Sequence, residues 1–379
     1  MKTAKLSKPS GAGRNCRFFQ VHLFFLLSIL LLLTSPSNLS AQFEEESVQA
    51  AYELRMNGEM WYAKAMLNKL IDMGRADGLT HYELARHKMH RMKGGWNTKI
   101  GNILTSATNA VSADPGNEAF AFFEAECYFL KAYMSMMRET ETAREDIADA
   151  INSFERVLEL KPDYHEARMH LVEIFYQLPE DMEGDKEKAE IHAVKLEEMD
   201  HYFGILAREI MLPEEASRIE YWQRIWKKNK EDPRIQKKLG LAYLSAGKPE
   251  ESKPLFESAM EKDPKYNTLI LHIARYHMYQ VMSDRSKSET ELPLAEAAIR
   301  EYLSLEPEPI APLKAWAIGS LSKMKFFGGE KEEGEKLMAE AQSLDPAFSR
   351  ASAIPGLELY NPPGEIYRSG DYSSFLRPF

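Results

Sequence analysis

Histidines beside carboxylates are the first residues in the sequence that could do chemistry. His165-Glu166 is followed by His170, whereas a zinc-protease helix needs two histidines at i and i+4 with glutamate next to the first. The spacing here is five, so the two rings would point about 140° apart on a helix of 3.6 residues per turn. We therefore expect no metal shared by these histidines.

A second pair of histidines, His87 and His90, has i and i+3 spacing and would share one face of a helix. Basic residues surround this pair, and their positive charge would repel a metal cation. The basic residues are Arg86, Lys88, Arg91 and Lys93. The pattern favours a solvated basic helix end over a metal site.

Alternating acidic residues at Asp181, Glu183 and Asp185 look like the start of a calcium-binding loop. Such a loop needs glycine at its sixth place and glutamate at its twelfth, but this sequence has Lys186 and His192 there. An acidic turn ahead of a helix explains the carboxylates, because the helix dipole favours negative charge at the N-terminus.

Motifs for nucleophilic or phosphate chemistry are missing from the sequence, which has no Gly-x-Ser-x-Gly and no glycine-rich phosphate loop. Cys127 stands in an apolar stretch before Tyr128, which favours a buried structural cysteine over a reactive thiol. We therefore expect a non-catalytic protein that needs no cofactor. An enzyme with no recognisable motif stays an open alternative.

The first 41 residues have the composition of a secretory signal peptide. Five basic residues and no acidic one accompany an apolar run from Phe18 to Leu33, and small residues end the segment before Gln42. This run has 16 residues, short of the ~20 that span a bilayer, so an uncleaved anchor is the weaker alternative. We expect cleavage after Ala41, export to the periplasm or beyond the cell, and no stable membrane insertion afterwards.

The chain is acidic, with 48 Lys and Arg against 58 Asp and Glu and a net charge of -10. Cleavage after Ala41 would change the net charge to -15. Nucleic-acid binding requires a basic face, so we expect no nucleic-acid partner. Cys127 would be the one cysteine left, so stability must come from packing and not from an internal disulfide.

Apolar residues recur at three- and four-residue spacing between Gln42 and Asp345, which predicts an all-α chain. The clearest repeated unit runs from Pro233 to Tyr266. Small residues at its positions 8 and 20 would let two antiparallel helices approach, and a large residue at position 24 would fill the gap to the next pair. The unit is marked by Leu239, Gly240, Tyr243, Ser252, Phe256, Ala259 and Pro264.

This 34-residue pattern resembles the tetratricopeptide repeat, with Ser252 in place of the usual alanine and Gln236 in place of the first-helix tryptophan. The same phase recurs in about seven units over residues 44–346, one of them degenerate around Trp222. The resemblance implies a right-handed α-solenoid of about seven helix pairs, which makes residues 42–346 one repeat domain.

Departures from the 34-residue period predict further features of the structure. Pro115 and Pro162 are 47 residues apart, which predicts extended helices or turns between them. Three inter-helix turns, at residues 94–99, 183–188 and 328–333, resemble those of exported bacterial tetratricopeptide proteins, including a periplasmic component of some solute transporters. This similarity implies a bacterial envelope location.

Residues 347–379 leave the repeat pattern. Their prolines and glycines prevent a long helix, yet the segment is too apolar for a linker exposed to water. We expect this tail to fold back in extended form on the last repeats and cover their open apolar face. The anchors would be Tyr360, Tyr367, Phe375 and Phe379.

The resemblance also implies a binding groove lined by the first helices of successive pairs, through their positions 2, 5, 9 and 12. Its N-terminal half would be apolar and acidic and its C-terminal half basic. The candidate contact residues are Phe122, Phe129, Met169, Tyr176, Arg234, Lys237, Leu241, Arg275 and Met278, with Glu126, Glu173 and Leu271 at equivalent positions. Because Leu241 stands where the chaperone-tail clamp of the family has asparagine, that activity is not expected.

The function that these observations predict is protein or peptide binding by an exported, non-catalytic scaffold. A transporter-associated accessory or solute-binding protein is the alternative that the three similar turns support.

Overall fold

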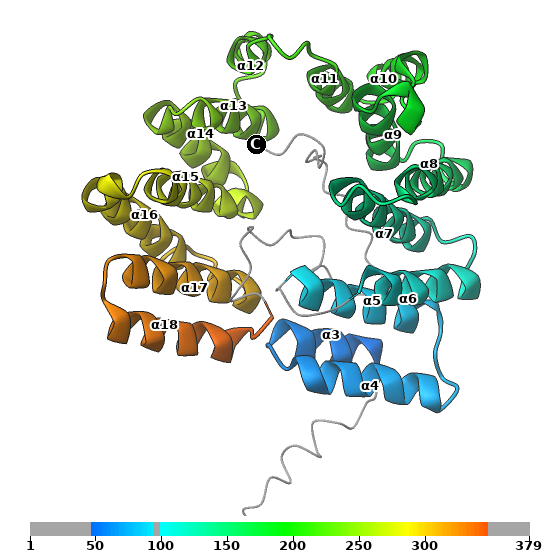
Figure 1. The fold of residues 1–379 in the computed structure, drawn as a ribbon, viewed down its shortest axis with the longest axis horizontal. Coiled ribbons are helices and arrows are strands. Elements are labelled where there is room, and N and C mark those ends of the chain that lie inside the picture. Colours follow the sequence, from blue (N-terminus) through cyan, green and yellow to red (C-terminus); the bar gives the residue numbers. More distant parts are fainter. Residues whose placement is uncertain (1–46, 94–98, 348–379) are drawn as a thin grey trace, which may run out of the picture. The chain divides into compact units, whose positions relative to one another are not determined.

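The computed structural model describes residues 47–93 and 99–347 (Figure 1). The expected signal peptide, the turn at 94–98 and the tail from residue 348 onward lie outside the described residues. The described residues form α-helices and short 3-10 turns with no strand among them. The α-helices are α3 Val48–Met56, α4 Met60–Asp72, α5 Gly78–Lys93, α6 Ile100–Ala113, α7 Glu118–Met137, α8 Ala143–Leu160, α9 His165–Gln177, α10 Lys186–Met199, α11 His201–Ile210, α12 Arg218–Trp226, α13 Pro233–Ser245, α14 Pro249–Lys262, α15 Leu269–Ser283, α16 Ser288–Leu303, α17 Ala311–Phe327 and α18 Lys331–Leu344.

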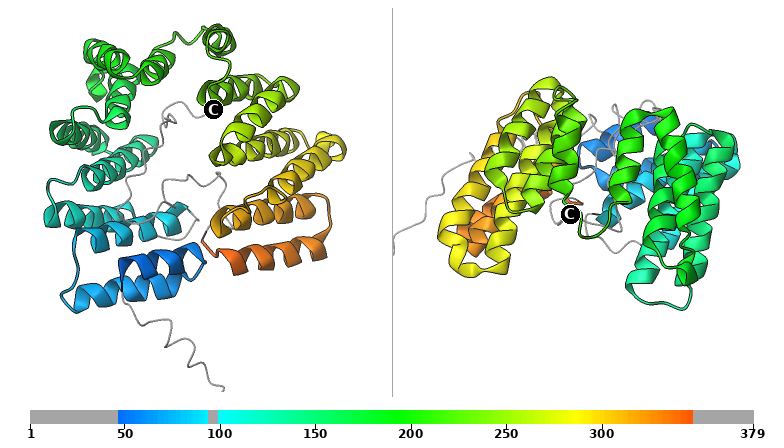
Figure 2. Two further views of the ribbon diagram at one scale, coloured as in Figure 1. Left: turned by 180° about the vertical axis from the view of Figure 1, so that it is seen from behind. Right: turned by 90° about the horizontal axis from the view of Figure 1, so that it is seen from above.

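The helices follow one another as pairs, eight in the described part of the chain, where the sequence predicts about seven. Seven pairs pack closely within themselves, and Figure 2 shows their succession from two further directions. The exception is α11 with α12, because α11 packs on α10 and α12 packs on α13. This is the degenerate unit around Trp222. The all-α repeat architecture that the sequence predicts is therefore confirmed.

The unit α13–α14 shows why this sequence forms a helix pair. Asp232 caps α13 by accepting a hydrogen bond from the Arg234 backbone N–H at 2.9 Å, and Gly247 follows the helix with φ of +76°. The Phe256 ring lies so close to Gly240 that a Cβ atom on Gly240 would be 2.4 Å from it. A glycine at position 8 and a phenylalanine at position 24 thus set the spacing of the two helices.

The long spacing between Pro115 and Pro162 results from two long helices, α7 and α8. Helix α7 has 20 residues and α8 has 18, whereas α13 has 13 and α14 has 14. The prediction of extended helices in this stretch is confirmed.

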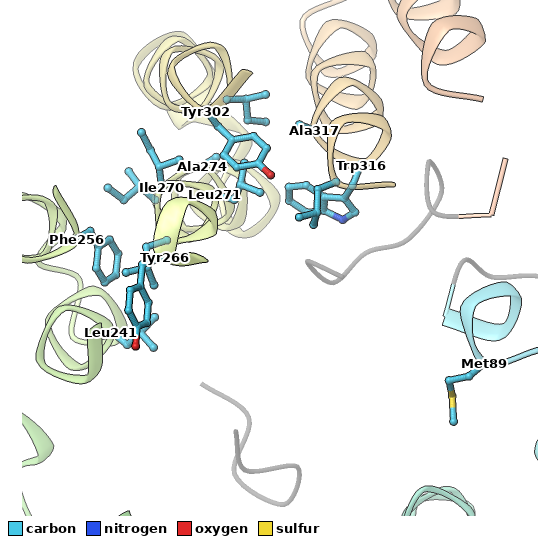
Figure 3. Packing of buried hydrophobic residues seen from close by; sticks show 14 of the residues in the cluster. Met89, Leu241, Phe256, Tyr266, Ile270, Leu271, Ala274, Tyr302, Trp316 and Ala317 are labelled. Atoms are coloured by element: carbon cyan, nitrogen blue, oxygen red, sulfur yellow. The ribbon is translucent and has the colours of Figure 1, made fainter. Parts of the chain in front are cut away.

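Buried apolar side chains form clusters that extend over successive helix pairs. One cluster joins α7, α8 and α9, and another joins α9, α10, α11, α12 and α13. Further along the chain, Leu241 and Phe256 lie near Tyr266, and Tyr302 and Trp316 continue the packing toward α17 (Figure 3). Each pair therefore depends on its neighbours for burial.

Candidate functional site

The predicted groove residues have three different environments. Arg275 is exposed, and Phe122, Tyr176, Arg234, Lys237 and Met278 are partly buried. Phe129, Met169 and Leu241 are buried at 5%, 0% and 4% exposure.

The three buried candidates pack inside the clusters. Phe129 makes an edge-to-face contact with His170, with ring centroids 4.9 Å apart. Met169 packs in the cluster that contains Trp222, and Leu241 packs in the cluster that contains Phe256. The expectation that all nine positions line an open groove is therefore not met at these three, because large neighbouring rings enclose them.

Three partly buried candidates already have partners within the chain. Phe122 stacks on Tyr164 with ring centroids 4.7 Å apart, and the Tyr176 hydroxyl donates to the Met211 carbonyl at 2.8 Å. Arg234 pairs with Asp232 at 2.7 Å, and the negative charge of this carboxylate raises the pKa of Arg234. These contacts hold the three side chains in place.

Two of the basic candidates lie together on successive first helices. The half-buried His272 of α15 has its pKa lowered to about 3 by burial, and the positive charges of Arg275 and Lys237 add to this effect. The positive charges of Lys237 on α13 and Arg275 on α15 thus both act on a neutral imidazole ring. We call Lys237 and Arg275 the cationic group; the neutral His272 beside Arg275 on α15 is a residue that the repeat positions did not predict.

The carboxylates expected in the N-terminal half of the groove differ in exposure, and Glu126 is partly buried. Burial raises the pKa of Tyr82, and the negative charges of Glu126 of α7 and Glu83 of α5 add to this effect. Glu173 of α9 is fully buried. An open groove at this place therefore does not include Glu173.

The histidine motif at residues 165–170 is divided between two contacts. The His165 ring stacks on Phe203 at 4.8 Å, whereas the His170 ring stacks almost parallel on Phe154 at 4.4 Å. Their different neighbours agree with the expected divergence of the two rings. Among the described residues, no group of three or more His, Cys, Asp or Glu side chains is placed to hold a metal ion.

Two further sequence interpretations are confirmed. Asp185 caps α10 by accepting hydrogen bonds from the backbone N–H groups of Glu187 and Lys188 at 3.1 and 3.0 Å, as an acidic turn before a helix should. Cys127 is fully buried, which agrees with a structural role.

The expectation of a solvated basic helix end at α5 is wrong. Arg86, His87 and His90 are buried at 0%, 1% and 0% exposure. The Arg55 Nε of α3 donates to Glu83 at 2.7 Å, and Arg86 lies 3.2 Å from the other oxygen of Glu83. A carboxylate within α5 and an arginine from α3 therefore convert this helix face into a buried polar network.

Two cavities open beside first helices. The larger, of about 520 Å³, lies between the ends of α5, α6 and α7 and has Asp77, Asp114 and Glu118 among its lining residues, with the rings of Tyr82 and Phe120. The other, of about 300 Å³, is lined by residues of α11, α12 and α13. The first has the size of a ligand pocket, and its carboxylates disfavour an anionic solute.

Buried histidines predict that acid destabilises the fold. Burial lowers the pKa of His170 to about 3, from its ordinary value of 6.5. The unfolded chain therefore binds more protons between these two values, and stability is highest above pH 6.5 and falls as the pH decreases toward 3, by ~1.4 kcal/mol for each unit of pKa difference. We expect His170→Phe, which keeps a ring against Phe154, to make the melting temperature less steep in pH between 6.5 and 4.

The control for this pH prediction is His201→Gln, because His201 is exposed. Its melting profile should follow that of the unchanged protein. An equal pH slope for His170→Phe and the unchanged protein would contradict the prediction.

The recurring helix pairs define a class of protein, an all-α helical-repeat protein. Residues 142–193, which cover α8, α9 and part of α10, match the family model described as tetratricopeptide repeat. The match and the recurring helix pairs support a tetratricopeptide repeat protein, as the sequence predicts. A search of curated proteins found no match.

Several solved structures are similar. A tetratricopeptide repeat protein from Parabacteroides merdae has 17% identity and a TM-score of 0.33, covering 80% of this chain and 93% of that chain. Human IFIT1, solved as a dimer with PPP-AAAA, has 12% identity and a TM-score of 0.35, covering 80% of this chain and 92% of that chain.

Proposed function

We propose that this chain is an exported, non-catalytic scaffold that binds a protein or peptide partner in the bacterial envelope. Tetratricopeptide repeats generally mediate protein interactions. The proposal of export rests on the basic and apolar leader, residues 1–41. Within residues 47–93 and 99–347, none of the helices has both the length and the apolar composition of a membrane span.

The observation that supports binding most directly is the cationic group. Lys237 and Arg275 come from successive first helices, α13 and α15, and the positive charges of both act on His272. Cations on successive first helices complement carboxylates of an extended segment, since a peptide crossing the helices would meet them one after the other. The partner is therefore a protein with an acidic segment or a terminal carboxylate.

Charge reversal tests this binding site. A partner isolated from an envelope extract should bind Lys237→Glu/Arg275→Glu at least about tenfold more weakly, which is ~1.4 kcal/mol. The melting temperature should change little, because partly exposed charges contribute little to folding.

The matched control reverses two charges on the second helices of the same pairs, Lys253→Glu/Arg300→Glu. These side chains are 47% and 59% exposed. The control should bind like the unchanged protein. Equal loss of affinity in both double variants would assign the effect to net charge and place the site elsewhere.

N-terminal sequencing of the protein tests the proposed export. Protein purified from the native host should begin at Gln42, because the small residues Ser40 and Ala41 precede the expected cleavage site. An N-terminal sequence starting at Met1 would contradict export and the net charge of -15 for the mature protein.

A further inference from the structure

The end of the last helix lies against the first helices of the array. Asp345 directly follows α18, and its Oδ2 atom is 2.8 Å from Nε2 of His90 in α5. The two side chains are fully buried although they are 255 residues apart in the sequence. A buried polar contact over this separation requires that both ends have a defined position.

The backbones also approach at the turn between α3 and α4. A Cβ atom on Gly58 would lie 2.2 Å from the Leu344 carbonyl oxygen and 3.5 Å from the Asp345 Cα. Gly58 also has φ of +79°. Only glycine fits here, both for its conformation and for the neighbouring chain.

The charges at this contact form a chain of partners. The Nε atom of Arg55 donates a hydrogen bond to Glu83, and the Nη1 atom of Arg55 lies 3.3 Å from Nδ1 of His90. Because arginine can only donate, Nδ1 accepts and Nε2 of His90 carries the proton that it donates to Asp345. Burial lowers the pKa of His90 to about 4, so at neutral pH the ring is neutral, as this arrangement requires.

The Asp345 turn repeats one found inside the array. Asp263 follows α14 and accepts a hydrogen bond from the Lys265 N–H at 3.0 Å, and Asp345 accepts one from the Ala347 N–H at 2.8 Å. Proline follows the aspartate in both. The Asp263 side chain is 36% exposed, whereas the Asp345 side chain is fully buried against α5. The turn at Asp345 is therefore covered by α5, which is distant in the sequence, whereas the turn at Asp263 is partly open to water.

We propose that the two ends of the repeat array cap each other, with the Asp345 turn held against α3 and α5, and that this end contact prevents either end from joining a second copy of the chain. Repeat arrays must cover the apolar faces at their ends. Here the Asp345 turn at one end of the array contacts α5 and the α3–α4 turn at the other end. An open array would present two complementary surfaces, and head-to-tail contacts between copies do not close on themselves.

The test measures the end contact directly. Spin labels on Glu53→Cys in α3 and Ser343→Cys in α18 use exposed positions, Cys127 is buried, and Cys16→Ser removes the other cysteine. We expect a single narrow distance distribution in the full chain. Asp345→Ala and Gly58→Ala should each broaden it toward longer distances and make the average mass in light scattering increase with protein concentration.

Two control variants replace the same residue types, aspartate and glycine, at positions outside the end contact. Asp263→Ala removes the equivalent turn aspartate. Gly74→Ala strains a glycine with φ of +65° that has no neighbour within 4 Å in the described part of the chain. Both should keep the narrow distribution and a constant mass.

Asp345→Asn serves if Asp345→Ala does not fold, because it keeps the side-chain shape while removing the charge. A narrow distribution retained in the Asp345 and Gly58 variants would overturn the proposal. Equal broadening in the control variants would overturn it as well, since loss of a turn aspartate or of a glycine would then be the cause.

Discussion

Replacing Phe256 by aspartate should unfold α13–α14 and weaken the pairs on both sides. The Phe256 side chain is 1% exposed and lies against Gly240. An unpaired carboxylate at this position costs several kcal/mol, which is comparable to the whole stability of many domains. Urea denaturation should show the loss, and hydrogen exchange should show faster exchange in α11 to α16 than in α3 to α6.

The control for this substitution is Phe327→Asp, because Phe327 is a 40% exposed phenylalanine at the end of α17. It should change the midpoint of denaturation only slightly. If Phe256→Asp changed stability no more than the control, the packing at position 24 would not determine the repeat spacing.

The second large effect is expected from Glu83→Ala in α5. Glu83 is fully buried between Arg55 and Arg86, so its removal leaves two guanidinium groups in the interior with less compensating charge. Breaking a buried ion pair in this way costs ~3–5 kcal/mol. Denaturation by urea should measure the loss.

An exposed glutamate provides the comparison. Glu53 lies on the surface of α3 and accepts a hydrogen bond from Gln49 at 3.0 Å. Glu53→Ala should be nearly neutral, and Glu83→Gln should lie between the two alanine variants because it keeps the shape without the charge. Equal stability of all three variants would show that the network contributes nothing to the fold.

Much of the repeat architecture can be predicted from local sequence. Gly240 and Phe256 specify how closely two neighbouring helices approach, and Asp185 specifies where a helix begins. Each of these signals acts within about one repeat, and periodic apolar spacing carries the same information along the whole array. The prediction of paired helices therefore succeeded, although the described residues form eight pairs where the sequence predicts about seven.

The buried network at α5 could not be predicted in the same way. His90 and Arg86 look like parts of a solvated surface because the sequence around them is basic. Their partners include groups from α3 and Asp345 at the far end of the array. Local charge does not report burial when the compensating groups lie in distant elements.

The groove prediction depended on assigning the same role to the same repeat position in every unit. Phe129 and Leu241 break the rule because aromatic residues of the next helices cover them. His272 was missed for the opposite reason, since its position is not one of the four that the resemblance assigns to the groove. Side-chain size in neighbouring units decides which positions remain accessible.

Site-specific photo-crosslinking in the native host would show whether the first helices bind a protein partner. A photoreactive residue at Arg275, which is exposed on the first helix α15, is compared with one at Arg300, which is exposed on the second helix α16. We predict a discrete protein adduct in the envelope fraction from position 275 and none from position 300. The same adducts at both positions, or no adduct at position 275, would contradict the account.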